Sequence, residues 1–297
     1  ANYLIETIEK AGFEAYQVGG CVRDFFMKRK CDDIDITTSA KPGDLEKILA
    51  ENNIKYIETG LKHGTVTAVF DGDNFEITTY RTDGEYIDNR HPENVSFVSN
   101  VDEDLSRRDF TINAIAYNPN KEEIVDLFGG RDDIENKIIK AVGNPDRRFK
   151  EDALRIMRAI RFSSTLGFEI EKNTKAALFR NKELLKNVSA ERIFTELSKL
   201  LLGDNVFDVL TEYKEIMGVI IPELVPIFTC GQNTVWHILT SILILQKQLG
   251  NRRGCFHLGL LCFFTISANP LQKLRMITEL TTLRDIKKSA QTLPHRF

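Results

Sequence analysis

The sequence predicts an α+β protein in which a mixed β-sheet with flanking helices is followed by an all-helical part. Up to about residue 144, short runs with the alternating pattern of strands are interspersed with short helical patterns. From residue 145 onward, apolar residues recur at helical spacing. At 297 residues, the chain is also long enough for more than one core. We therefore expect three parts, at residues 1–144, 145–203 and 204–297.

Local patterns place the elements of the first part. Leu4, Ile5 and Ile8 have helical spacing and predict a helix over 3–11. Asp71-Gly72 separates two alternating runs and predicts a hairpin turn. Together the runs predict a mixed sheet flanked by helices. The expected strands are Ala15–Val18, Asp33–Thr37, Thr65–Phe70, Phe75–Tyr80 and Ile138–Val142.

Two helices are expected in the second part. Apolar residues fall on one face of a segment that runs from Phe149 to Arg161. The opposite face of this predicted helix carries Asp152, Arg155, Arg158 and Arg161. Residues 189–202 repeat the helical pattern, with Ser189 as the N-cap.

Composition excludes several classes of protein. Hydrophobic residues make up 42% and charged residues 28%, which excludes collagen-like, low-complexity and wholly disordered chains. The net charge of −3 means that a nucleic-acid partner would need a local basic patch. The longest apolar stretch, Thr234–Leu245, is too short and polar to cross a bilayer. Five cysteines without a CxxC pair are typical of reduced thiols, so we expect a soluble, cytoplasmic protein without a membrane partner.

The most informative stretch joins a glycine pair to two aspartates. Gly19-Gly20 lies between a predicted strand and helix, where backbone N–H groups can approach phosphates closely, and Arg23 would add a phosphate donor in the first helical turn. Asp33 and Asp35 are two apart, so on a strand both carboxylates face the same way. Such a pair suits two Mg²⁺ ions that bridge a triphosphate and an attacking hydroxyl. An ordinary turn followed by an acidic strand face is the alternative.

This combination, GGxVRD followed by DxD, resembles the DNA polymerase β-type nucleotidyltransferase superfamily. Within it, the chain is similar to the class II tRNA nucleotidyltransferases and bacterial poly(A) polymerases, because further motifs follow in order over roughly residues 17–200. The resemblance implies a nucleotidyltransferase head, a helical neck that reads the base, and a helical body and tail that bind RNA. The further motifs are Arg107–Ala114 (RRDFTxNA, nucleotide sugar and phosphates), Asp126–Asp133 (DxFGGxxD, hinge), Glu151–Arg155 (EDxxR, base reading) and Glu191–Glu196 (ERxxxE, the brace of the base-reading helix).

The base-reading pair also follows from chemistry. Asp152 and Arg155 are three apart, so on one helix their side chains would be neighbours. Asp accepts and Arg donates hydrogen bonds, which matches the amino group and ring nitrogen of cytosine and of adenine. Uracil and guanine present the reverse order, so buried groups would be left unpaired at a cost of roughly 1–3 kcal/mol each. The alternative is an ordinary surface salt bridge.

Several other residues have two interpretations. Arg158 and Arg161 continue the stripe as triphosphate or base-positioning donors, or form a solvated face. Glu76 is either a third carboxylate near the metals or an exposed strand residue. Residues 82–98 are expected to form a polar loop, either a binding lid or a solvent loop. His237 and His257 are either metal ligands of a phosphohydrolase domain or core or interface histidines. Their apolar neighbours favour the second interpretation, and the sequence has no His-Asp pair of the kind that such a domain needs.

The resemblance implies template-independent addition of CMP and AMP, from CTP and ATP, to the 3′ end of tRNA. In that function Asp33 and Asp35 are the catalytic residues and Mg²⁺ ligands. The implied nucleotide-binding residues are Gly20, Arg23, Arg108, Asp152, Arg155, Arg158 and Arg161. Two alternatives stay open, an enzyme that adds only A and a tRNA-binding module without catalytic activity.

Overall fold

The computed structural model describes residues 1–31, 33–60, 64–84 and 95–222. The chain separates into two compact units, Ala1–Ile220 and Ile221–Phe297, and nearly all described residues belong to the first. The helices of its N-terminal part are α1 (Asn2–Lys10), α2 (Gly20–Phe26), α3 (Pro42–Glu51), α4 (Val101–Ser106) and α5 (Gly130–Glu135). The strands are β1 (Ala15–Val18), β2 (Asp35–Thr38), β3 (Lys55–Gly60), β4 (Thr65–Phe70), β5 (Asp73–Thr79), β6 (Arg81–Asp83), β7 (Val95–Phe97), β8 (Ala116–Asn118), β9 (Glu123–Val125), β10 (Ile138–Ile139) and β11 (Glu169–Ile170). The later helices are α6 (Pro145–Glu151), α7 (Leu154–Leu166), α8 (Lys172–Asn181), α9 (Ala190–Leu200), α10 (Val206–Glu212) and α11 (Lys214–Ile220), with 3₁₀ turns at Thr111–Asn113 and Lys182–Asn187.

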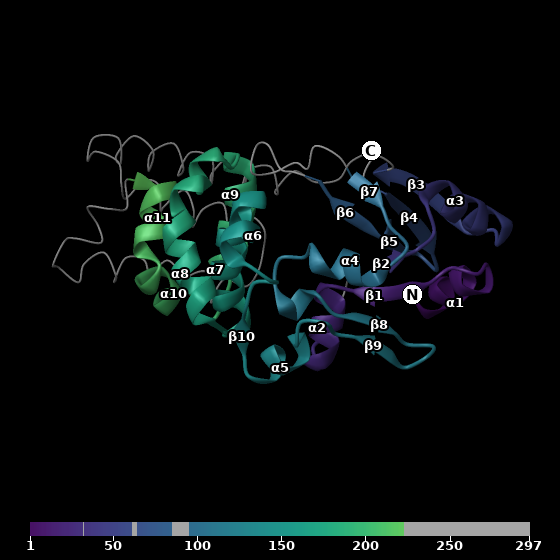
Figure 1. Cartoon of the computed structure of the whole chain (residues 1–297), viewed down its shortest axis with the longest axis horizontal. Helices are drawn as coiled ribbons and strands as arrows, with labels where there is room; N and C mark the ends of the chain where they lie inside the picture. The colour runs from purple at the N-terminus through teal and green to yellow at the C-terminus, as the bar shows by residue number, and fades with distance from the viewer. Residues whose placement is uncertain (32, 61–63, 85–94, 223–297) are drawn as a thin grey trace, which may run out of the picture. The chain divides into compact units, whose positions relative to one another are not determined.

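A seven-stranded mixed sheet forms the head, in the order β3-β4-β5-β2-β1-β8-β9 (Figure 1). β2 and β5 run parallel, whereas the other neighbouring pairs are antiparallel. The predicted fold class is confirmed, and the bounds of β1 and β4 agree with the prediction. Helices follow from residue 145 onward. The boundary expected at 203–204 stays a prediction.

The hairpin of β4 and β5 has the predicted two-residue turn. Phe70 pairs with Asp73, and Asp71 and Gly72 between them have φ angles of 55° and 85°. Positive φ at both central residues is the signature of a type I′ turn, whose twist matches that of the flanking strands. This local turn fixes the register of the strand that carries Glu76.

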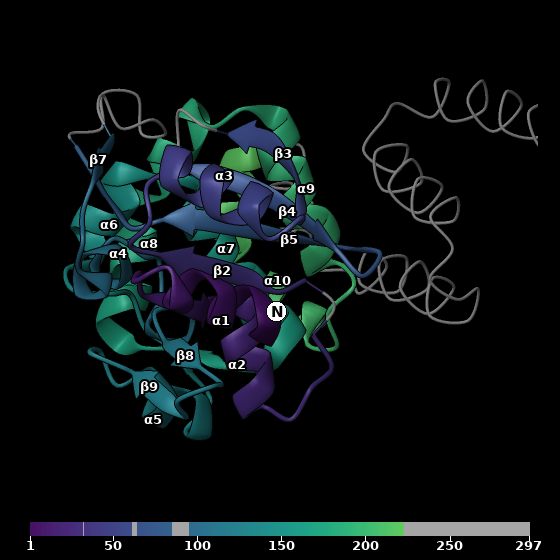
Figure 2. The ribbon, with the colours of Figure 1, turned by 90° about the vertical axis from the view of Figure 1, so that its right-hand side faces the viewer.

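The two faces of the sheet pack against different helices. α1 and α3 cover one face, with Leu4, Ile5, Leu45 and Leu49 fully buried against the strands (Figure 2). On the other face, a smaller cluster joins residues of β1 and β8 to α4. Asp35 pairs in register with Val18 of that cluster, so the second face is the one that carries the predicted catalytic carboxylate.

The expected continuous helix from Phe149 to Arg161 is wrong, because the structure contains two helices. α6 ends at Glu151, and Asp152 has an extended backbone with φ −138° and ψ 106°. The Oδ1 atom of Asp152 accepts the N–H of Leu154 at 3.1 Å. An aspartate that bonds to a nearby backbone N–H favours the start of a new helix over continuation of the old one.

The expected loop at residues 82–98 is partly a β-ladder. β6 and β7 pair antiparallel, with Arg81 opposite Phe97 and Thr82 opposite Ser96. Residues 85–94, which include the tip of the segment, lie outside the described residues. The lid and the solvent-loop interpretations both stay open.

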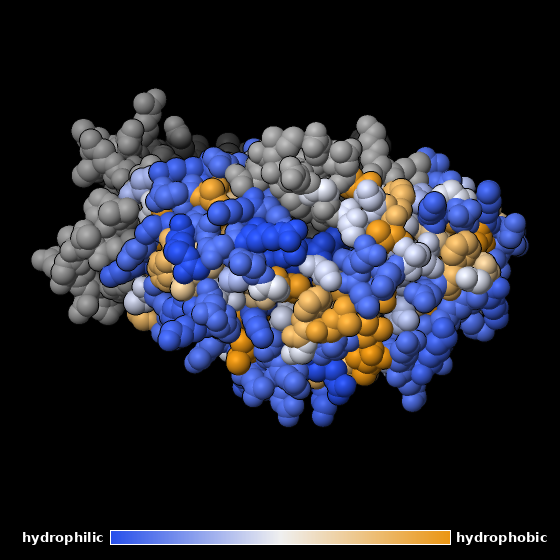
Figure 3. All heavy atoms as spheres, viewed as in Figure 1, coloured by the Kyte–Doolittle hydropathy of each residue, from blue (hydrophilic) through white to orange (hydrophobic). Residues whose placement is uncertain are grey.

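Figure 3 shows a mostly hydrophilic face with a hydrophobic area over α2, β8 and β9. Phe25 and Leu127 are 54% and 48% exposed, and the Phe25 ring stacks on Tyr117 with 5.2 Å between centroids. Within the described ranges, no helix has the length and hydropathy of a membrane span. Cys21 and Cys31 are free thiols. Cys230, Cys255, Cys262, His237 and His257, and the stretch 234–245, lie outside the described residues.

Candidate active site

The glycine turn, a predicted catalytic carboxylate and an arginine meet at the end of β1. Gly19 has a φ of 79° and precedes Gly20, the first residue of α2. A Cβ on Gly19 would lie 3.3 Å from Nη1 of Arg108 and 3.9 Å from Oδ2 of Asp35. The positive φ favours glycine at position 19, and an added Cβ would also crowd the end of the Arg108 side chain. Two predicted site residues, Asp35 and Arg108, therefore approach the residue that directly precedes Gly20.

Three carboxylates lie near one another at the start of β2. Asp35 starts the strand, Asp33 lies two residues before it, and Glu76 is its partner in the parallel ladder with β5. The expectation that both aspartates lie on the strand is therefore only half met. Loss of hydration raises the pKa of Asp35, Glu76 and Asp33 raise it further, and Arg108 opposes them.

This surplus of negative charge suits a hard divalent cation. Asp33, Asp35 and Glu76 are exposed, and no described residue donates a hydrogen bond to the Asp35 carboxylate. Within the described residues, no group of three or more acidic, His or Cys side chains has the spacing of a complete metal site. Mg²⁺ is commonly held by one or two carboxylates and takes its other ligands from substrate phosphates and water. The donor set therefore fits Mg²⁺ that arrives with a nucleotide.

Arg108 has an unsatisfied donor at this site. Its Nη2 donates to Asp104 at 3.1 Å, whereas its buried Nε has no hydrogen-bond partner in the described part of the chain. A buried guanidinium nitrogen without an acceptor is costly, and a phosphate or sugar oxygen would satisfy it. Arg108 is therefore suited to the predicted contact with the nucleotide.

The buried carboxylate of Asp109 connects the head to α7. Its Oδ2 accepts Nε of Arg158 at 2.7 Å, and its Oδ1 accepts Nδ2 of Asn113 at 3.1 Å. Burial alone would raise the pKa of Asp109, but Arg158, the hydrogen bond from Asn113 and Arg155 lower it to about 2. Arg158 therefore neutralises a buried carboxylate. In this structure it is neither an unpaired donor for a nucleotide nor part of a purely solvated face.

Arg23 points into the protein rather than toward a phosphate. Its side chain is 9% exposed, Nη1 donates to Asn113 at 2.8 Å, and Nε and Nη2 donate to Asp24. The expected role as a phosphate donor is not supported by this geometry, because its donors are already satisfied. Arg23, Arg158 and Arg161 instead surround the ring of Phe162, at 5.2, 5.5 and 3.7 Å from its centroid.

Asp152 and Arg155 have separate partners and do not form the expected side-by-side pair. Both oxygens of Asp152 accept from Arg192 of α9, at 3.3 and 2.8 Å. Arg155 is buried and donates to Glu151 at 2.8 Å and to the carbonyls of Arg148 and Arg107. The break between α6 and α7 is the reason, because the three-residue spacing no longer lies on one helix.

The motif on α9 braces this region, as the resemblance implied. Arg192 holds Asp152, and Glu196 accepts Nε of Arg161 at 2.8 Å while lying 3.9 Å from Arg158. Glu196 is only 5% exposed. The side chains of Arg158 and Arg161 are therefore held by carboxylates from two different elements.

The hinge motif packs closely beneath the site. Asp126 accepts the backbone N–H groups of Gly130 and Arg131, at 2.8 and 2.9 Å, and so caps α5. A Cβ on Gly130 would lie 2.2 Å from the carbonyl oxygen of Thr111, so only glycine fits there. The RRDFTxNA segment therefore rests directly on this helix.

Sequence reasoning missed Asp104, which holds both arginines of the RRD motif. Its spacing of three and four residues to Arg107 and Arg108 was a readable signal for ion pairs on a helix. A pocket of about 250 Å³ lies beside this cluster, and Arg107, Arg148 and Glu151 contribute to its lining.

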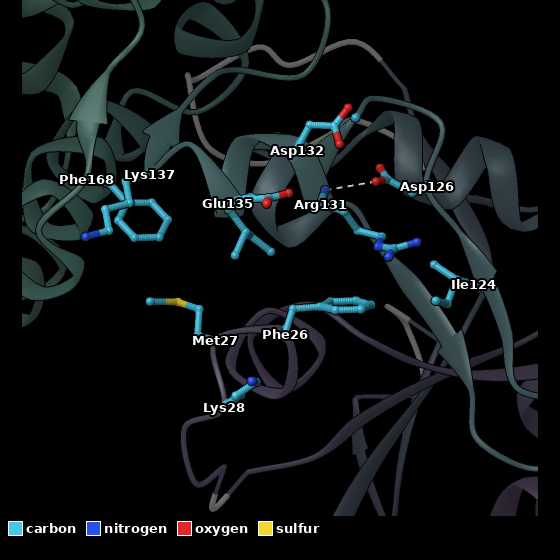
Figure 4. A pocket seen from close by; sticks show the side chains of 12 residues that line it. Phe26, Met27, Lys28, Ile124, Asp126, Arg131, Asp132, Glu135, Lys137 and Phe168 are labelled. Carbon is cyan, nitrogen blue, oxygen red and sulfur yellow. Dashed lines mark hydrogen bonds between the residues drawn. The ribbon is translucent and has the colours of Figure 1, made fainter.

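A larger pocket, of about 920 Å³, lies between α2 and α5 and contains none of the predicted site residues (Figure 4). Phe26 and Met27 line one side, and Arg131 projects from α5 across the Phe26 ring, 5.1 Å from its centroid. Its lining mixes cationic, acidic and apolar side chains, so its chemistry does not indicate a particular ligand.

Two family models match the chain. The poly(A) polymerase head domain matches residues 15–140, and the probable RNA and SrmB-binding site of polymerase A matches residues 167–227. A CCA-adding enzyme of Lactobacillus helveticus is 52% identical over 67% of this chain and 49% of its own length. One from Oceanobacillus iheyensis is 41% identical over 87% of this chain and 62% of its own length.

A solved structure agrees with these matches. The CCA-adding enzyme of Bacillus stearothermophilus in complex with CTP is 38% identical, with a TM-score of 0.69, over 82% of this chain and 62% of that one. The present chain thus spans about half the length of several curated relatives that it matches.

Proposed function

Because this chain belongs to the nucleotidyltransferase family of CCA-adding enzymes and poly(A) polymerases, we propose that it adds CMP and AMP to the 3′ end of tRNA. CTP and ATP are the proposed nucleotide substrates and tRNA the proposed partner. One observation carries the proposal, namely that Asp35, Arg108 and the Gly19-Gly20 turn meet at one point. The CTP in the related Bacillus stearothermophilus structure also supports it.

Asp33 and Asp35 are the proposed ligands of Mg²⁺, with Glu76 as a candidate third carboxylate. When bound, Mg²⁺ would neutralise charge on the triphosphate and lower the pKa of the attacking 3′-hydroxyl. The three carboxylates repel each other without a cation. The register of β2 and β5 holds Asp35 beside Glu76, and Asp33 lies two residues before the strand.

Arg108 and the glycine turn are proposed to bind the phosphates and sugar. The turn provides room, since it has no Cβ at the point where Arg108 and Asp35 approach. Arg108 provides the buried Nε donor. Three arginines are proposed to support the site without contacting the nucleotide. Arg23, Arg158 and Arg161 would do so by holding α2 against α7 around the Phe162 ring.

Asp152 and Arg155 remain the proposed base readers. In the present structure the Asp152 carboxylate is held by Arg192, and the terminal nitrogens of Arg155 are held by carbonyls and Glu151. Reading C or A with this pair therefore requires an exchange of hydrogen bonds when the nucleotide binds. A base is then selected only if its hydrogen bonds to Asp152 and Arg155 replace the ones that these residues give up.

Incorporation assays test this function. Purified full-length chain and Mg²⁺ are incubated with tRNA that lacks its last three nucleotides, with CTP alone, ATP alone or both. Extension by CCA supports the proposal, whereas extension by A alone would establish the A-only alternative. Failure to extend while tRNA still binds would establish the non-catalytic module. Asp35→Asn serves as the inactive control. The cytoplasmic location stays a prediction.

A further inference from the structure

Asp104 is the most completely buried carboxylate near the site, with no exposed side-chain surface. It lies on α4 and accepts hydrogen bonds from both arginines of the RRD motif. Nε and Nη2 of Arg107 donate to it at 3.0 and 2.7 Å, and Nη2 of Arg108 donates at 3.1 Å. The backbone N–H of Arg81, at 3.4 Å, and the hydroxyl of Thr37, at 3.5 Å, approach the same carboxylate.

The two arginines connect Asp104 to the two ends of the proposed nucleotide site, the phosphate end and the base end. Arg108 extends toward Gly19 and Asp35, where the phosphates and sugar are proposed to bind. The backbone carbonyl of Arg107 accepts Nη2 of Arg155 at 3.1 Å, so Asp104 reaches the proposed base reader through the backbone of a residue whose side chain it holds. A single buried carboxylate is therefore connected to both ends.

We propose that Asp104 is a positioning residue that fixes Arg108 at the phosphate end and, through Arg107, Arg155 at the base end. This inference rests on the proposed nucleotidyltransferase function. Arginine side chains have many rotamers, and a fixed acceptor removes that freedom before the ligand binds. A shared acceptor also fixes the spacing between the two ends of the site, so base selection and phosphate binding depend on the same carboxylate.

The charge of Asp104 agrees with this role. Burial favours the neutral acid, but Arg108 and Arg107 outweigh burial and hold the pKa of Asp104 below its usual range. The carboxylate is thus ionised near neutral pH and can accept from two guanidinium groups at once. Asparagine in its place would offer one acceptor oxygen and no charge.

Two separate readouts test the proposal in the full-length chain. Inhibition by inorganic tripolyphosphate reports on the phosphate end alone, and the relative kcat/KM for the four nucleotides reports on the base end. We expect Asp104→Asn to raise the tripolyphosphate inhibition constant about 10-fold and to lower the preference for CTP and ATP over UTP and GTP by about 3- to 10-fold. Arg108→Ala should affect mainly the first readout, and Arg107→Ala, which removes the hydrogen bonds from residue 107 to Asp104, mainly the second.

The double variant Asp104→Asn/Arg108→Ala should weaken tripolyphosphate inhibition no more than Arg108→Ala alone, because Asp104 acts through Arg108. The matched control is Glu9→Gln, which changes a largely buried carboxylate elsewhere in the head that accepts from Asn118 and Lys121. It should leave both readouts unchanged.

Additive losses in the double variant would overturn the proposal. So would an Asp104→Asn variant that lowers kcat equally for all four nucleotides with unchanged tripolyphosphate inhibition, which is the signature of a purely structural role. If Asp104→Asn does not fold, Arg107→Ala still decides, because it removes the side-chain hydrogen bonds that join residue 107 to Asp104. Unchanged discrimination in that variant contradicts the link to Arg155. If the unaltered chain fails to incorporate nucleotides, the proposed function fails, while tripolyphosphate binding, measured directly, still tests the hold of Asp104 on Arg108.

Discussion

Replacing Asp109 by asparagine should destabilise the protein at neutral pH and remove part of its sensitivity to acid. The buried carboxylate pairs with Arg158 at 2.6 Å and accepts from Asn113, and its pKa is about 2 against an ordinary value of 3.8. That difference is equivalent to about 2 kcal/mol of stability from the ionised form at neutral pH. Because the substitution leaves Arg158 without its partner in a mostly buried pair, the free energy of unfolding should fall by about 2–4 kcal/mol in total.

The sign of the pH dependence follows from the lowered pKa. Because Asp109 binds its proton more weakly in the folded state, its stabilisation is complete above about pH 4 and lost as the pH falls toward 2. The stability gap between the wild type and Asp109→Asn should therefore be about 1 kcal/mol smaller at pH 3 than at pH 6.

Urea unfolding at pH values from 3 to 7 measures this gap. The matched control is Asp146→Asn, which removes a carboxylate that pairs with Arg180 at 2.7 Å on the surface, with both side chains more than a third exposed. An exposed pair of this kind is worth at most about 1 kcal/mol. Equal losses in the two variants, or a gap for Asp109→Asn that stays constant with pH, would refute the reasoning.

Two further predictions concern specificity and packing. Asp152→Ala should lower kcat/KM for CTP and ATP by about 10- to 100-fold and for UTP and GTP by less, which steady-state assays with all four nucleotides check. A uniform loss would make Asp152 a helix support and not a base reader. Gly130→Ala should lower the free energy of unfolding by about 1–3 kcal/mol, because its methyl group meets the carbonyl oxygen of Thr111. Gly43→Ala, where nothing lies within 4 Å of the added carbon, should be neutral or slightly stabilising in the same urea titration.

Strands with local signals were predictable from the sequence. β1 and β4 have the predicted bounds because alternation and turn residues lie within the strands and the adjoining turns. The break at Asp152 was not predicted, because the apolar spacing around it continues unchanged across a two-residue interruption, Asp152 and Ala153. At the break, Asp152 has an extended backbone, accepts the N–H of Leu154 and is held by Arg192 from α9, a partner far away in the sequence.

The side-chain partners depend on tertiary structure to a greater degree. Residue type and motif order identified Arg23 and Arg158 as members of the site region, but their partners lie far away in the sequence. Arg23 binds Asn113 and Arg158 binds Asp109, contacts that exist only after the sheet has formed. A motif predicts which residues gather near a site, and the fold decides which of them stay available to a ligand.

The strand order has a consequence for synthesis of the chain. β1 is flanked by β2 on one side and by β8 on the other, and Arg23, just after β1, bonds to a residue 90 positions later. At about 5–20 residues per second, a ribosome needs roughly 5–18 s to make the intervening segment. During that interval β8 is not yet available to one edge of β1, and Arg23 lacks its partner Asn113. Because β8 and β9 are the last strands of this sheet to be made, the sheet cannot be completed before they add to that edge.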